Sequence, residues 1–143
     1  MVYLRVMKNN ITKPDGIHSF LNDKIFLNNI EYKREDFEKI STESGCSIKT
    51  HPLNTQMRVI EIEKDTNING IDCKAVLIES TDGVIDTIIL YPYFLSIWIA
   101  TCSIKCKPDI YDTPLGECCD YVYDESHKIT IGPDGSMIYI WYD

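Results

Sequence analysis

The chain contains very little alanine and little leucine. Its 143 residues include 2 Ala and 8 Leu, against 22 Ile. Alanine and leucine are among the strongest helix formers, whereas isoleucine is stiff at its first side-chain torsion and fits a pleated sheet. The composition therefore argues against a mainly helical protein and predicts a chain rich in β-structure.

Signature motifs of common enzyme classes are also missing. The sequence has no HExxH, GxxxxGK[ST], GxGxxG or GxSxG pattern, each of which marks a defined metal, nucleotide or nucleophile site. Its three histidines are scattered, and no local pattern joins one of them to a nucleophile and an orienting group. The sequence thus names no catalytic residue and no cofactor, and it favours a protein without catalysis.

Basic residues are scarce in the last quarter of the chain. Residues 108–143 hold one Lys and eight Asp or Glu, a net charge of −7 within a total of −8, whereas residues 1–50 carry +1. Because Lys and Arg provide most of the affinity for nucleic-acid phosphates, this acidic surface should repel nucleic acids and anionic membranes. It should attract basic proteins, although a net charge of this size also serves solubility alone.

A secretion signal is not evident at the N-terminus. The stretch MVYLRVMKNN has no apolar core of about seven residues and no small-residue cleavage site. We therefore expect a cytoplasmic protein, in which the six cysteines are thiols more readily than disulfides.

One long apolar run, Val84 to Ile104, has Asp86 as its only charged residue before Lys105. A membrane helix needs about 20 apolar residues, but the uncharged part here is about 18 residues long and contains Pro92. We therefore predict a buried strand over Val84–Tyr91 that ends at Pro92, since proline cannot donate within a ladder. The part from Tyr93 to Ile104 fits either a short helix or a strand.

The expected fold is a single α+β domain, residues 1–143, built mainly from an antiparallel sheet of hairpins and a meander with one or two short helices packed on it. Arg34–Ser44 is the clearest helix, with acidic residues in its first turns and Gly45 as its stop. Turn residues at Asn28-Asn29, in STDG (80–83) and in GPDG (132–135) predict hairpins. We expect residues Cys106–Asp120, with two prolines, to form a long loop.

The cysteines offer a possible metal site. Cys102 and Cys106 are four apart, and Cys118 and Cys119 are adjacent, whereas a zinc knuckle usually has about two residues between its cysteines. Adjacent cysteines on a strand also point to opposite faces. The spacing therefore assigns no metal ligand, and it leaves three states open: thiols, a disulfide from Cys106 to Cys118 or Cys119, or a zinc-stabilised interaction module.

Asp86 suggests a second kind of site, because a buried carboxylate must be paired or have a shifted pKa. A small-molecule pocket or an enzyme site beside the break at Pro92 would be lined by Asp86, Tyr91, Tyr93 and Trp98. The alternative is that Asp86 lies on the wetter side of its strand, close to the Asp82-Gly83 turn.

The acidic segment near the C-terminus interleaves carboxylates with tyrosines, a composition suited to a basic protein surface. We predict a small non-catalytic binding protein that blocks a basic partner by steric occlusion, in the manner of immunity proteins and phage-encoded inhibitors of host defence. The predicted partner-binding residues are Asp109, Tyr111, Asp112, Glu117, Asp120, Tyr121, Tyr123, Asp124 and Glu125.

Overall fold

The computed structural model describes residues 16–93 and 107–142, in which strands predominate and two short α-helices accompany them. No helix in these two ranges is long and apolar enough to cross a membrane. The elements are α2 (Gly16–Leu21), β1 (Lys24–Leu27), β2 (Ile30–Lys33), the 3-10 turn η1 (Arg34–Asp36), α3 (Phe37–Ser44), β3 (Ile48–Thr50), β4 (Met57–Ile62), β5 (Thr66–Ile68), β6 (Ile71–Thr81), β7 (Val84–Pro92), β8 (Asp109–Thr113), β9 (Gly116–Val122), β10 (His127–Ile131) and β11 (Met137–Trp141).

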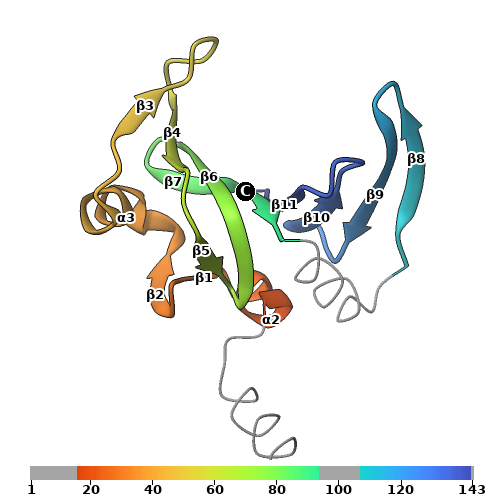
Figure 1. The fold of residues 1–143 in the computed structure, drawn as a ribbon, viewed down its shortest axis with the longest axis horizontal. Coiled ribbons are helices and arrows are strands. Elements are labelled where there is room, and N and C mark those ends of the chain that lie inside the picture. The colour runs from red at the N-terminus through yellow and green to blue at the C-terminus, as the bar shows by residue number, and fades with distance from the viewer. Residues whose placement is uncertain (1–15, 94–106, 143) are drawn as a thin grey trace, which may run out of the picture.

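The strands of the described chain form one antiparallel sheet, as the sequence predicts. Their order is β2-β1-β5-β6-β7-β11-β10-β9-β8, and β4, which carries β3, pairs with the second half of β6. The last four strands are a meander whose final strand, β11, returns to pair with β7. Figure 1 shows the sheet bent so that β3 and β4 rise at one end and β8 and β9 at the other, with α2 and α3 outside the bend.

The predicted central strand is confirmed. β7 lies between β6 and β11, and its side chains Ile85, Ile88 and Leu90 are fully buried. Pro92 is the last residue of the strand, where its missing N–H removes no interior ladder bond. The prediction for Tyr93 to Ile104 lies outside the described residues from position 94 onward.

The core has an aromatic centre that joins α2 to the end of the chain. The Phe20 ring stacks on Tyr139, with ring centroids 4.9 Å apart, and lies 4.9 Å from the Trp141 ring. The indole Nε1 of Trp141 donates to the Phe20 carbonyl over 3.2 Å. Burial of these large rings, each fully or almost fully inaccessible, holds the short helix α2 against β11.

The predicted helix at Arg34–Ser44 is present as η1 followed by α3. Phe37 and Ile40, three residues apart, are fully buried and form its core-facing side. The helix ends where Gly45 adopts a left-handed conformation at φ 71°, which glycine tolerates without steric penalty.

Two tight turns also form as predicted. Asn28 and Asn29 connect β1 to β2 with φ values of 50° and 68°. Asp82 and Gly83 connect β6 to β7 with φ values of 55° and 82°. Positive φ at both central residues matches the right-handed twist of the strands, so these residue types determine where each hairpin closes.

The long loop expected over Cys106–Asp120 is wrong for residues 109–120. These residues form a hairpin in which Thr113 pairs with Gly116 and Asp109 pairs with Asp120, and Pro114 and Leu115 occupy the turn. The two prolines misled the prediction. Pro108 precedes β8 and Pro114 lies in the turn between β8 and β9, so neither interrupts the pairing of the strands.

Candidate functional site

The β8–β9 arm, residues Asp109–Val122, forms one end of the sheet. β8 pairs with β9 alone, and β9 pairs on its other side with β10. In Figure 1 the arm stands at the opposite end from β3 and α3. It contains six of the nine residues that the sequence predicts for partner binding, so the acidic segment becomes one continuous structural feature.

The carboxylates of the arm are largely unneutralised. Asp109, Asp112 and Glu117 are exposed, and no ion pair joins them to a basic side chain of the described chain. Residues 107–126 hold one Lys and six Asp or Glu, a net charge of −5. The arm therefore carries a local negative potential toward any approaching molecule.

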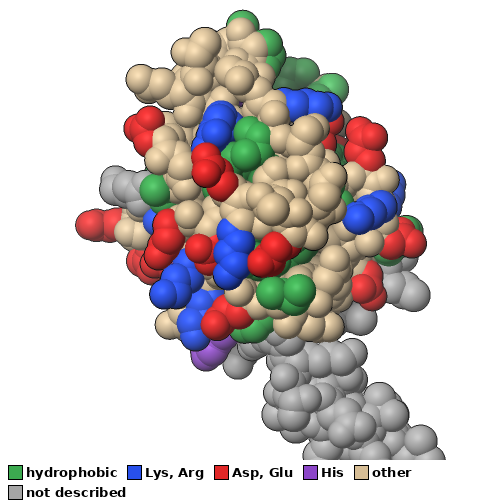
Figure 2. All heavy atoms as spheres, turned by 90° about the vertical axis from the view of Figure 1, so that its left-hand side faces the viewer, with side chains coloured by type: hydrophobic (Ala, Val, Ile, Leu, Met, Phe, Trp, Pro, Cys, Tyr) green, Lys and Arg blue, Asp and Glu red, His purple; other side chains and the backbone are tan. Residues whose placement is uncertain are grey.

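The opposite end of the protein has a different charge distribution. Figure 2 shows Lys and Arg interspersed with Asp and Glu on the face that lies at the left of Figure 1. Between β1 and β2, Lys24 Nζ lies 3.4 Å from Glu31 Oε1, and between β4 and α3 an Arg58 guanidinium nitrogen lies 3.0 Å from a Glu38 carboxylate oxygen. Mutual neutralisation on this face leaves the arm as a distinct acidic surface.

Apolar side chains of the arm reach solvent beside these acids. Ile110 is 60% exposed, Leu115 at the turn is 89% exposed, and Val122 is 53% exposed. Sequence reasoning missed Ile110 and Leu115 because it assigned both to a loop, and it singled out only acids and tyrosines of the segment, so that Val122 was missed as well. The available signal was the Thr-Pro-Leu-Gly turn (113–116), which lies between the strand formers Ile110-Tyr111 and Tyr121-Val122. Exposed apolar groups among acids are typical of a protein-binding surface.

The Asp120 side chain makes its contacts within the sheet. One of its carboxylate oxygens, Oδ1, accepts hydrogen bonds from the Tyr111 hydroxyl at 3.0 Å and from the Thr130 hydroxyl at 2.8 Å, while Lys128 Nζ lies 3.9 Å from Oδ2. The bond to Asp120 raises the pKa of Tyr111. Asp120 thus connects β8 through β9 to β10 and orients Tyr111, whose side chain is still 43% exposed.

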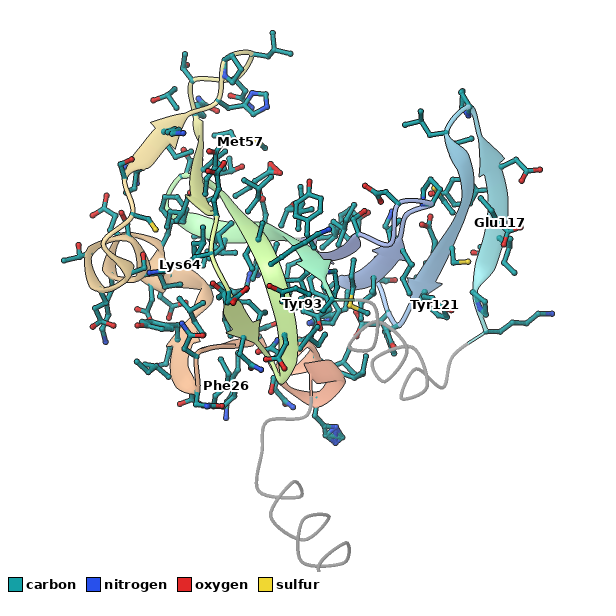
Figure 3. All side chains as sticks on the ribbon, viewed as in Figure 1. Phe26, Met57, Lys64, Tyr93, Glu117 and Tyr121 are labelled. Atoms are coloured by element: carbon teal, nitrogen blue, oxygen red, sulfur yellow. The ribbon has the colours of Figure 1, made fainter. Side chains whose placement is uncertain are left out.

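The remaining predicted residues lie at the base of the arm and beyond it. Tyr121 and Tyr123 pack against the hydrophobic core, and Figure 3 shows Tyr121 close to β10 while Glu117 lies further out along the arm. Asp124 bonds to the His127 ring, and Glu125 is exposed in the β9–β10 turn. The surface open to a partner therefore comprises Asp109, Tyr111, Asp112, Glu117 and Glu125, together with the three exposed apolar side chains.

The predicted pocket residues fall at different places. Tyr93 lines a cavity of about 360 Å³ together with Asp65, Thr66, Asp72 and Cys73, and its hydroxyl donates to the Asp65 carboxylate. Asp86 and Tyr91 do not line this cavity, and Trp98 lies outside the described residues. The pocket beside Pro92 stays a prediction.

Asp86 lies in an irregular part of the β6–β7 ladder. The pairing jumps from Thr87 with Glu79 to Ile85 with Ser80, so Asp86 has no partner of its own and forms a β-bulge. Its Oδ2 accepts from the Thr81 hydroxyl at 2.7 Å, while its buried Oδ1 has no hydrogen-bond partner. Burial, together with the Asp86 charge, raises the pKa of Glu79. The bulge brings two carboxylates together, but it assembles no nucleophile or metal centre.

The cysteines of the described chain are thiols. Cys118 is buried and Cys119 is half-buried on the opposite face of β9, and neither is disulfide-bonded. Burial raises the pKa of Cys119, with further contributions from Glu117, Cys118 and Asp120, so the thiolate is disfavoured. No group of three or more His, Cys, Asp or Glu in residues 16–93 and 107–142 is placed to hold a metal ion; Cys102 and Cys106 lie outside these ranges.

Comparison with protein families, curated proteins and solved structures finds no match to this chain. The function is therefore inferred from the arm itself.

Proposed function

We propose that this protein is a non-catalytic binding protein that engages a basic protein partner through the β8–β9 arm. One observation carries the proposal: Asp109, Asp112 and Glu117 stand exposed without cationic partners from the described chain, beside the exposed apolar side chains of Ile110 and Leu115. Unneutralised acids steer and select a basic surface, and apolar side chains supply the contact area that retains it.

The shape of the arm supports inhibition by occlusion. A two-stranded hairpin at the end of a sheet can reach into a concave basic site while the rest of the domain covers its rim. The partner would be a basic enzyme or nucleic-acid-binding protein whose site the arm covers, as immunity proteins and phage-encoded inhibitors of host defence do. This comparison is one of class, and it rests on size, acidity and the geometry of the arm.

The proposal is tested by affinity capture with a charge variant and a matched control. The test variant combines Asp109→Asn, Asp112→Asn and Glu117→Gln. The control combines Glu35→Gln, Glu63→Gln and Asp82→Asn, which change the net charge equally at exposed positions outside the arm. Each tagged protein is incubated with lysate of its own organism or of that organism's host, at about 50 mM and about 500 mM salt, because surface attraction is screened at the higher concentration.

We expect wild type and control to retain the same basic protein at low salt and to lose it at high salt. The arm variant should retain much less at either concentration, because it lacks the charges that attract the partner. Equal capture by the arm variant and the control would contradict the proposal, since the binding surface would then lie elsewhere. The proposal would also be contradicted if wild type retained no specific protein at low salt.

A further inference from the structure

Among residues 16–93 and 107–142, no strand pairs with the outer edge of β8. β8 is the last strand of the sheet order, and every residue from Asp109 to Asp112 is exposed. Within the described residues, the backbone of β8 forms hydrogen bonds with β9 alone. In an antiparallel ladder the N–H and C=O groups of alternate residues point away from the paired strand. The edge of β8 therefore presents backbone donors and acceptors that a further strand can pair with.

The side chains along this edge have a symmetric pattern. Asp109 and Asp112 flank Ile110 and Tyr111, so the order is acidic–apolar–apolar–acidic in either direction. Side chains directly opposite each other on neighbouring strands lie close enough to interact, and opposite charges stabilise such pairs while like charges destabilise them. A strand that pairs with β8 should therefore carry basic, apolar, apolar and basic side chains in sequence, whether it runs parallel or antiparallel.

We propose that β8 binds an extended segment of the partner as an additional strand, and that this segment has the pattern basic–apolar–apolar–basic. The inference rests on the proposed function and specifies how the basic partner is recognised. Backbone pairing would provide affinity, and the four side-chain positions would provide selectivity, as in other cases of strand addition.

The same pattern disfavours a second copy of this chain as the occupant. Two β8 strands paired antiparallel about their centre would place Asp109 of each copy opposite Asp112 of the other. Each such pair brings like charges together on an exposed edge, which destabilises the pairing. The acids at both ends of β8 thus protect the open edge from self-association while leaving it available to a basic segment.

The test uses synthetic peptides of about eight residues, titrated against the full chain by fluorescence anisotropy. The patterned peptide is Thr-Thr-Lys-Val-Ile-Lys-Thr-Thr, and a shuffled peptide places both Lys together at one end. Two further versions of the patterned peptide are N-methylated at alternate residues, on the odd positions or on the even positions. N-methylation removes backbone donors along one edge of the peptide and leaves the side chains and their charge unchanged.

If β8 accepts a strand, the patterned peptide binds, and one N-methylated version loses at least about tenfold in affinity while the other keeps most of it. The shuffled peptide should bind more weakly. The Asp109→Asn, Asp112→Asn variant should weaken binding of the patterned peptide by roughly two- to thirtyfold, since it removes two cross-strand charge pairs.

Different results would contradict strand addition and recognition by the acidic arm. Equal binding of both N-methylated peptides overturns strand addition; the proposed function then survives if the charge variant still weakens binding. No binding of the patterned peptide at about 1 mM also overturns strand addition, and the capture experiment continues to test the acidic arm. Loss of binding with both N-methylated versions alike also overturns strand addition, because pairing along a single edge predicts that only one version loses affinity.

Discussion

His127 leads to a prediction about how stability depends on pH. Its ring lies between two carboxylates: Nδ1 is 2.8 Å from Asp124 Oδ1 and Nε2 is 2.8 Å from Asp23 Oδ1. Ionised carboxylates only accept hydrogen bonds, so both ring nitrogens must donate and the ring must be protonated to form both bonds. The His127 side chain is 11% exposed, and the Phe20 ring lies edge-on at 5.2 Å.

Opposing effects act on the pKa of His127. Burial lowers it, but the hydrogen bonds and charges of Asp124 and Asp23 raise it by more, so that it lies above the usual 6.5. The folded state therefore binds the proton more tightly than the unfolded state. This stabilisation is complete below about pH 6.5 and is lost as the pH rises through the higher pKa of the folded state.

The size of the stabilisation by protonated His127 depends on how exposed the Asp23 and Asp124 carboxylates are. A buried hydrogen bond to a charged group contributes about 1.5–3 kcal/mol, but both carboxylates are about half exposed and solvent screens them. We therefore expect protonated His127 to contribute about 1 kcal/mol, equivalent to roughly 2–4 °C in Tm for a chain of this size.

The assay is urea unfolding of wild type and of His127→Gln at intervals between pH 6 and pH 9. Wild type should lose about 1 kcal/mol more than the variant across this window. His18→Gln, at an exposed position on α2, is the matched control and should follow wild type. Parallel curves for wild type and His127→Gln would refute the argument, because the imidazolium would then contribute no pH-dependent stability.

Three further predictions concern stability. Phe20→Ala should cost about 3–5 kcal/mol in urea unfolding, because this fully buried ring anchors the aromatic core; a cost below about 1 kcal/mol would contradict that role. Because burial and Asp86 raise the pKa of Glu79, Glu79→Gln should raise the Tm at pH 7 but not below about pH 4; an unchanged Tm at pH 7 would count against this. Asn69 is buried at φ 50° and its Oδ1 accepts a hydrogen bond from Phe26 N at 2.7 Å. Asn69→Ala should therefore lower the free energy of unfolding, measured in urea, by about 2–3 kcal/mol; a loss below about 0.5 kcal/mol, as expected at an exposed site, would contradict this.

Much of the sheet could be predicted from the sequence because its signals are local. The apolar run that ends at Pro92 predicts β7, and Asn28-Asn29 and Asp82-Gly83 determine where two hairpins turn. β8 and β9 were harder to predict because Asp, Glu and Pro have low strand propensity. Their pairing depends on contacts across the sheet, such as those of Asp120 with Tyr111 and Thr130, which no local window contains.

The candidate site could be predicted in composition but not in orientation. The sequence shows where the acidic segment lies in the chain, but strand register decides which of its side chains are available. Tyr121 and Tyr123 turn toward the core, and Asp120 and Asp124 are engaged by internal hydrogen bonds. A register change of one residue would reverse these orientations, so sequence composition alone could not separate exposed side chains from those with structural roles.

The central claim is that the acidic arm is the binding surface, and the most direct test is the salt dependence of partner affinity. The captured partner is titrated against wild type, the arm variant and the matched control between about 50 mM and about 500 mM salt. The claim predicts steep weakening with salt for wild type and control, and a weaker, flatter dependence for the arm variant. The same affinity and the same salt dependence for all three proteins would contradict it.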